Sequence, residues 1–148
     1  MDRKSKILFF STGDSTRSQM AEGFLRTLAT TGDLIPVSTA VQAAALDPLA
    51  IVVMKEVGVD ISGQQAKDVA ESLKDHFACV VTVCDAVHER FPVWPFTRNI
   101  FHWNLADPAT VQGSPEQRRQ VFRSVRDQIN RNVRELVSMT LPRLHIPA

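Results

Sequence analysis

The segment that most constrains the fold of this chain is a short apolar run at residues 7–10 that breaks into small polar residues. The run, Ile-Leu-Phe-Phe, is apolar throughout and does not alternate, which is typical of a strand buried on both faces. After the polar stretch, Met20, Phe24 and Leu28 recur at a helical spacing. We expect that helix to begin near Ser18, so the segment predicts a strand, a loop and a helix in succession.

The rest of the chain alternates between strand and helix patterns. Further strands are predicted at residues 35–40, 78–84 and 99–104, and helices after Asp47-Pro48, over about residues 65–75, and from Ser114-Pro115 to a point before Pro142. The predicted fold is α/β with three layers, a four-stranded parallel sheet with helices on both faces. The sequence has 148 residues and shows neither a linker nor a repeat, so we expect residues 1–148 to form one domain.

Composition and charge exclude several function classes. The formal net charge is +1, and the basic residues of the last predicted helix are interleaved with acidic ones, so nothing predicts a nucleic-acid surface. No stretch is apolar enough for a signal peptide or a membrane span, which favours a cytoplasmic protein without a membrane partner. The two cysteines, Cys79 and Cys84, have neither disulfide-framework nor zinc-site spacing, and we expect both to be reduced and buried.

The polar stretch after the first predicted strand has the composition of an anion-binding loop. It consists of Ser11, Thr12, Gly13, Asp14, Ser15, Thr16, Arg17 and Ser18. Small residues let backbone N–H groups converge, the following helix contributes the positive end of its dipole, and an arginine adds a bidentate fork for phosphate or arsenate. The alternative is an ordinary turn with a Ser/Thr helix cap and a surface arginine, and local composition does not separate the two.

The spacing and the surrounding motifs resemble a known family. Ser11 and Arg17 are separated by five residues, and the run "TGDSTRSQMAEGF" follows Ser11. This stretch resembles the low-molecular-weight protein tyrosine phosphatases and, more closely, the arsenate reductases of the same fold. The resemblance continues through "VSTA", "DISGQQAKDV", "VVTVCD" and "FHWNLADPA". It implies the low-molecular-weight phosphatase fold and a pocket that takes phosphate, arsenate or an aryl phosphate.

The resemblance also implies a role for three residues. In the family a cysteine attacks phosphorus or arsenic, an arginine holds the oxyanion, and an aspartate before a proline protonates the leaving group. By matching position these roles fall to Ser11, Arg17 and Asp107. An Asp-Pro pair is also a common helix start, with the aspartate as N-cap. Composition does not distinguish that role from an acid at Asp107.

The main departure from the family is the serine at position 11. A field of N–H groups and a guanidinium can lower the pKa of a thiol enough to ionise it at neutral pH, but a hydroxyl starts too high. Ser11 would need a general base, and the sequence offers no candidate. We therefore expect oxyanion binding without useful turnover. Two explanations stay open: an engineered change in an otherwise active enzyme, or a natural pseudophosphatase that senses oxyanions or binds phosphotyrosine.

A potassium site is implied by the resemblance to some arsenate reductases, and no other metal site is predicted. The matching ligands are Asp14, Glu22, Ser38 and Asp68. Oxygen ligands suit a hard cation. The alternative is that Glu22 and Asp68 are solvated helix carboxylates, because spacing alone does not bring them together.

The redox relay of the thioredoxin-coupled arsenate reductases is incomplete. In the family the nucleophile passes its disulfide to two further cysteines, of which only the first has a counterpart here, Cys84. Phe91 stands at the second position. A thioredoxin-type cycle is thus disfavoured, whereas a small-thiol reductant would need only the missing nucleophile. Cys84 is either a redox remnant or a small core residue, and no other cofactor or protein partner is predicted.

Overall fold

A five-stranded parallel sheet forms the centre of the protein, in the strand order β3-β2-β1-β4-β5. The computed structural model describes residues 5–11, 15–29, 33–40, 46–84, 97 and 99–144, without the side chains of residues 84 and 140–144. The strands are β1 (Ser5–Ser11), β2 (Leu34–Ala40), β3 (Lys67–Asp68), β4 (Cys79–Cys84) and β5 (Ile100–Asn104).

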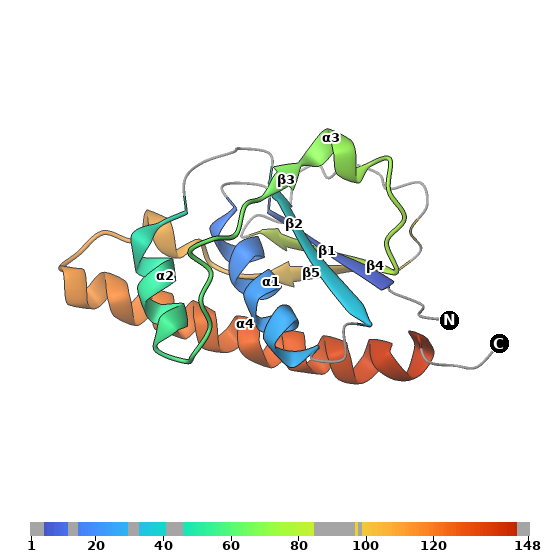
Figure 1. Ribbon diagram of the computed structural model, residues 1–148. Helices are drawn as coiled ribbons and strands as arrows, with labels where there is room; N and C mark the ends of the chain where they lie inside the picture. Colours follow the sequence, from blue (N-terminus) through green and yellow to red (C-terminus); the bar gives the residue numbers. More distant parts are fainter. Residues whose placement is uncertain are drawn as a thin grey trace.

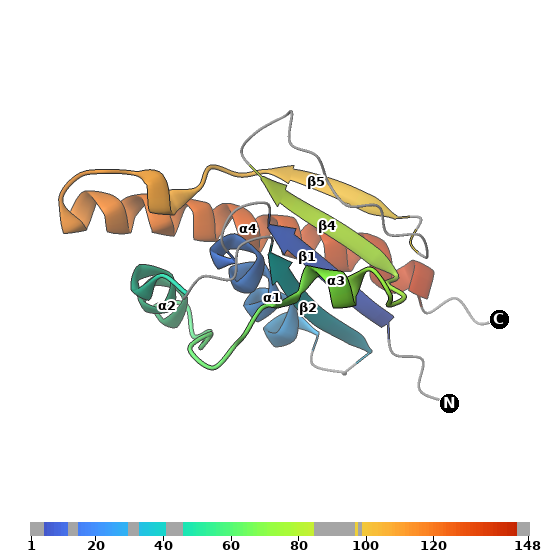
Figure 2. The same cartoon turned by 90° about the horizontal axis from the view of Figure 1, so that it is seen from above.

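Helices lie on both faces of this sheet (Figure 1). They are α1 (Thr16–Leu28), α2 (Pro48–Lys55), α3 (Val69–Ser72) and α4 (Pro115–Leu144), with a 3-10 turn at Pro108–Thr110. The helices α1 and α4 cover one face of the sheet and α3 lies on the other, while α4 runs along the whole length of the sheet (Figure 2). No helix within the described residues is long and apolar enough to cross a membrane. The predicted three-layer α/β architecture is confirmed.

The first strand supplies the core on both faces, as its apolar run predicts. Ile7 and Phe9 are buried with residues of α1, α2 and α4 in the larger apolar cluster. Leu8 and Phe10 are buried in a smaller cluster on the α3 side. Successive strand residues point to opposite faces, so four consecutive apolar residues place β1 in the middle of the sheet.

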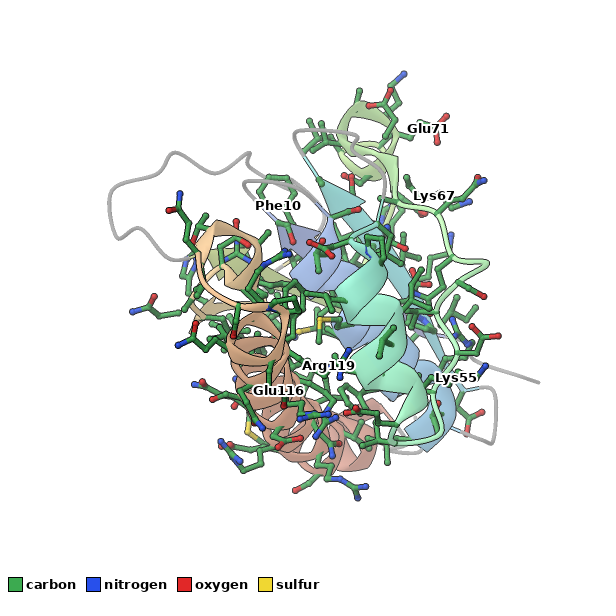
Figure 3. All side chains as sticks on the ribbon, turned by 90° about the vertical axis from the view of Figure 1, so that its left-hand side faces the viewer. Phe10, Lys55, Lys67, Glu71, Glu116 and Arg119 are labelled. Atoms are coloured by element: carbon green, nitrogen blue, oxygen red, sulfur yellow. The ribbon has the colours of Figure 1, made fainter. Side chains whose placement is uncertain are left out.

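All five strands end at the same edge of the sheet. Ser11 pairs with Ala40 of β2 and with Val83 of β4. Ala40 in turn pairs with Asp68 of β3. In open α/β sheets ligands bind outside the carboxyl ends of the strands. Figure 3 looks onto this edge, with Phe10 near the end of β1 and Lys67 in β3.

Three details of the sequence prediction are wrong. The sheet has five strands rather than four, because the two-residue strand β3 is too short to give a periodic signal. The helix expected over 65–75 shrinks to α3, which begins after its N-cap Asp68 and ends at Ser72. The last helix does not end before Pro142 but continues to Leu144, because a proline in the final turn removes a single backbone hydrogen bond.

Helix α1 packs closely against the segment that follows α2. A Cβ atom added to Gly23 would lie 2.6 Å from Ile61 Cγ2 and 3.0 Å from Val59 Cγ1. Both residues are buried in the core. Gly23 therefore lets α1 and the segment after α2 pack closely, and any larger residue at this position would force them apart.

Gly23→Ala should lower the free energy of unfolding. The gain in helix propensity is about 1 kcal/mol, whereas overpacking of this kind costs typically about 1–3 kcal/mol. Urea unfolding of the variant and the parent measures the difference. Gly63→Ala is the matched control, since nothing lies within 4 Å of its added Cβ, and it should leave stability nearly unchanged. A Gly23→Ala protein more stable than the parent would contradict the close packing.

A charged cluster joins α2 to α4. Arg123 donates from Nε and Nη2 to the two carboxylate oxygens of Glu56, at 3.0 and 2.7 Å. Arg126, which is 9% exposed, donates from Nη1 to Glu56 Oε1 at 2.8 Å and to the Val53 carbonyl at 3.0 Å. The hydrogen bond from Arg123 is the main cause that lowers the pKa of Glu56 from 4.5 to about 2.

Glu56→Gln should destabilise the protein near neutral pH but not in strong acid. A carboxylate with a lowered folded-state pKa contributes stability above its unfolded value, 4.5, and loses it as the pH falls toward about 2. The difference in unfolding free energy between parent and variant should therefore shrink across that window. Denaturant titrations at several pH values measure it, and a difference independent of pH would show that the pair contributes nothing through charge.

Candidate oxyanion site

The loop between β1 and α1 is closed by a hydrogen bond between its two ends. The backbone N–H of Ser18 donates to Ser11 Oγ at 3.2 Å, and both residues are fully buried. Thr12, Gly13 and Asp14 lie outside the described residues. The side chain at position 11 therefore faces an N–H group from the first turn of α1, as the anion-loop interpretation requires.

Ser18 also ties the loop to β2. Its hydroxyl donates to the Ser15 carbonyl at 3.0 Å, with the Thr39 carbonyl of β2 at 3.5 Å. Ser15 and Thr16 are each 1% exposed. The described part of the loop is thus packed inside the protein, and Ser15 makes no side-chain capping bond, so neither observation favours the alternative of an ordinary turn with a Ser/Thr cap.

Arg17 is the largest of the fully buried side chains. It is 1% exposed, and Nη1 donates to the Leu105 carbonyl at 2.7 Å. Its Nε has no hydrogen-bond partner within the described part of the chain. A guanidinium carries its charge at neutral pH, and a buried charge without an opposite partner is strongly unfavourable. Arg17 is therefore no surface arginine, and its unused donor suits an anion.

The segment that Arg17 contacts leads directly to Asp107. Leu105 is buried and directly follows β5, which ends at Asn104, and Asp107 lies two residues later at partial exposure. Asp107 is the N-cap of the 3-10 turn Pro108–Thr110, where Oδ1 accepts a hydrogen bond from the Ala109 N–H at 3.0 Å. The structure thus shows the capping role, and the contact of Arg17 with Leu105 brings this loop beside the site.

Two of the four potassium candidates, Glu22 and Ser38, lie near each other, while Asp68 caps a helix. Burial is the main cause that raises the pKa of Glu22, and the neighbouring Ser38 acts on its carboxyl in the opposite direction. Asp68 Oδ1 caps α3 by accepting from the Ala70 N–H at 2.8 Å. The Glu22 side chain is only 13% exposed, so the solvated alternative is wrong for Glu22. Asp14 is not described, and the potassium site stays a prediction.

The cysteines differ in what the structure shows. Cys79 is 1% exposed, and burial raises the pKa of its thiol to about 12, so the expected inert core residue is confirmed. Cys84 ends β4 beside Asn104 of β5, at the same sheet edge as Ser11. Its side chain is not described, so the choice between redox remnant and core residue remains a prediction. No group of three or more metal-ligating side chains occurs among the described residues.

Sequence reasoning missed two contributors to the site. Gln19 is 3% exposed, and Nε2 donates to Ser15 Oγ at 2.7 Å. The Leu105 carbonyl accepts from Arg17. Gln19 lies one helical turn after Ser15, and a polar residue at this spacing was a sequence signal for a contact between the two side chains. No sequence signal identifies Leu105, because its contribution is a backbone oxygen.

Comparison with known proteins gives the family. The family profile described as "Low molecular weight phosphotyrosine protein phosphatase" matches residues 6–144. The chain belongs to this family. An arsenate reductase of Halalkalibacterium halodurans is 37% identical over 132 residues, which cover 88% of this chain and 94% of the relative. A glutaredoxin arsenate reductase of Synechocystis is 36% identical over 134 residues, or 90% of this chain and 96% of that protein.

Solved structures of family members agree with this fold. A structure described as an arsenate reductase in the phosphate binding state superposes with a TM-score of 0.76 at 32% identity. The superposition covers 91% of this chain and 98% of that one. The resemblance inferred from the loop motifs is thus confirmed for the fold and the family.

Ser11→Cys should give a thiol that reacts as a thiolate near neutral pH. The N–H of Ser18 and the buried guanidinium of Arg17 stabilise a negative charge at this position, so the pKa of the new thiol should fall below the ordinary value of about 8.5. The rate of alkylation by iodoacetamide as a function of pH measures it. The parent, which retains Cys79 and Cys84, supplies the background. An ordinary thiol pKa would show that the loop does not stabilise an anion.

Proposed function

We propose that the loop of residues 11–18 binds inorganic phosphate or arsenate, with Arg17 as the charged ligand. The observation that carries the proposal is the Nε donor of Arg17, buried and without a partner in the described part of the chain. An oxyanion would neutralise the guanidinium and use this donor in a charge-assisted hydrogen bond. The N-terminus of α1 adds the favourable end of its dipole.

The same geometry supports binding without turnover. The Ser11 side chain accepts its one described hydrogen bond from the Ser18 N–H, and no hydrogen bond described in the structure joins Ser11 to a carboxylate or an imidazole. A serine nucleophile needs a base to take its proton. We therefore infer that the protein as it stands is an oxyanion-binding member of the family, whether Ser11 is native or introduced.

Restoring a thiol at position 11 should complete an active site. A thiolate there would attack the bound phosphorus or arsenic, Arg17 would hold the oxyanion, and Asp107 would protonate the leaving oxygen. The capping bond uses only Oδ1 of Asp107, which leaves the other carboxyl oxygen for that proton. With arsenate, a small thiol such as glutathione would attack the sulfur of the thiolate–arsenic adduct, which releases arsenite and leaves a mixed disulfide that a second thiol would reduce. The glutaredoxin arsenate reductase among the relatives supports this choice.

Arsenate is favoured over phosphotyrosine by the relatives. Several curated relatives carry the name arsenate reductase, and the matches cover nearly their whole length. Phosphate and arsenate have the same shape and charge, so one pocket accepts both. Binding of phosphotyrosine is an outcome that the experiment below distinguishes.

Calorimetric titration with phosphate, arsenate and phosphotyrosine tests the proposed function. The parent should bind both inorganic anions, and Arg17→Lys should weaken binding by about tenfold or more because a bidentate fork is replaced by a point charge. Arg131→Lys on the exposed surface of α4 is the matched control and should bind like the parent. Circular dichroism melts establish that each variant is folded.

Turnover is measured on the same proteins. The parent should neither hydrolyse an aryl phosphate nor reduce arsenate with glutathione. Ser11→Cys should gain one of these activities, and Asp107→Asn in that background should lose most of it. A parent that binds no anion, or that turns over substrate through Ser11, would contradict the proposal.

A further inference from the structure

The serine that precedes α1 does not cap its own helix. Ser15 occupies the N-cap position, yet its side chain makes no capping hydrogen bond. A serine at this position ordinarily accepts from the N–H of the second or third helical residue. Here the third helical residue is Ser18, whose N–H donates to Ser11 Oγ instead.

The hydroxyl of Ser15 is engaged by Gln19, one helical turn farther along. Gln19 Nε2 donates to Ser15 Oγ at 2.7 Å. Ser15 is 1% exposed and Gln19 3% exposed. Gln19 Oε1 has no hydrogen-bond partner in the described part of the chain. Burying an amide that is only half satisfied is unfavourable, so an apolar residue would serve packing better at this position.

The segment after α2 fixes the place of Gln19. Gln64 Nε2 donates to the Gln19 carbonyl at 2.8 Å. The close approach of this segment to α1 depends on Gly23, whose added Cβ would meet the side chain of Ile61. The helix turn that carries Gln19 is therefore held from outside the loop.

We propose that Gln19 is a positioning residue that keeps the N-terminus of α1 open for the oxyanion. By binding the Ser15 hydroxyl, its amide holds Ser15 in its present backbone conformation (φ −88°, ψ 6°) and away from the extended conformation in which a serine hydroxyl caps the first-turn N–H groups. A serine cap and a bound oxyanion use the same donors and the same end of the helix dipole. The inference rests on the proposed function, because it concerns how the same loop receives its anion.

Gln19→Leu tests this role through a rescue that a purely structural residue would not show. Without the amide, Ser15 should cap α1 and compete with the anion, so phosphate and arsenate should bind about fivefold more weakly. The double variant Gln19→Leu/Ser15→Ala has no hydroxyl to form the cap and should recover most of the lost affinity. Calorimetric titration with each anion measures all three proteins.

The controls separate positioning from packing. Gln120→Leu makes the same change on the exposed face of α4 and should bind like the parent. The melting temperature of anion-free Gln19→Leu should not fall below that of Gln120→Leu, because the new cap offsets the lost bond. Gln19→Met, which is unbranched, provides a second variant if leucine does not pack.

Each outcome decides between the alternatives. Weakened binding by Gln19→Leu with recovery in the double variant supports the positioning role. Unchanged binding by Gln19→Leu, or a double variant as weak as the single one, overturns it while the proposed function stands. A parent that binds neither anion removes the proposed function and this inference together.

Discussion

The buried guanidinium of Arg17 is the constraint around which the site is arranged. Removing such a charge from water is strongly unfavourable unless it gains a partner of opposite charge. The described structure supplies one neutral acceptor, the Leu105 carbonyl, and leaves Nε without a partner. An oxyanion would provide the missing charge. We therefore regard the anion-bound protein as the state for which this end of the sheet is built.

Two neighbouring elements make that burial possible. The strand β1 ends at Ser11, with β2 and β4 on either side, so the loop begins inside the molecule. The helix α1 is pressed against the segment containing Ile61 at Gly23, which holds its first turn in place. The contact between Arg17 and Leu105 then links the loop to the residues before Asp107. The loop that contains Arg17 and the segment that leads to Asp107 thus share a buried connection.

In our account, the serine at position 11 permits oxyanion binding but does not act as a nucleophile. The N–H of Ser18 can stabilise a charge at position 11, but a hydroxyl keeps its proton in a field that would ionise a thiol. The burial of Arg17 and its hydrogen bond to the Leu105 carbonyl do not involve the side chain at position 11. The described residues thus fit the proposed oxyanion receptor, and Ser11 lacks the thiol that the proposed chemistry needs.

The parts of the protein that the sequence predicted are those with local signals. The run at residues 7–10 predicted a strand buried on both faces, and the spacing of Ser11 and Arg17 with the motifs around it indicated the family. Strand β3 escaped prediction because two residues carry no period. The contact of Arg17 with Leu105 and the bond of Gln19 to Ser15 depend on how distant or neighbouring elements pack, which residue types alone do not reveal.

A crystal structure of the protein grown with arsenate tests the central claim most directly. The anomalous signal of arsenic locates the anion without ambiguity. The account predicts arsenate inside the loop of residues 11–18, hydrogen-bonded to Arg17 Nε and not covalently attached to Ser11. Arsenic absent from the loop would contradict the binding claim, and a bond between arsenic and Ser11 Oγ would contradict the claim that this serine is no nucleophile.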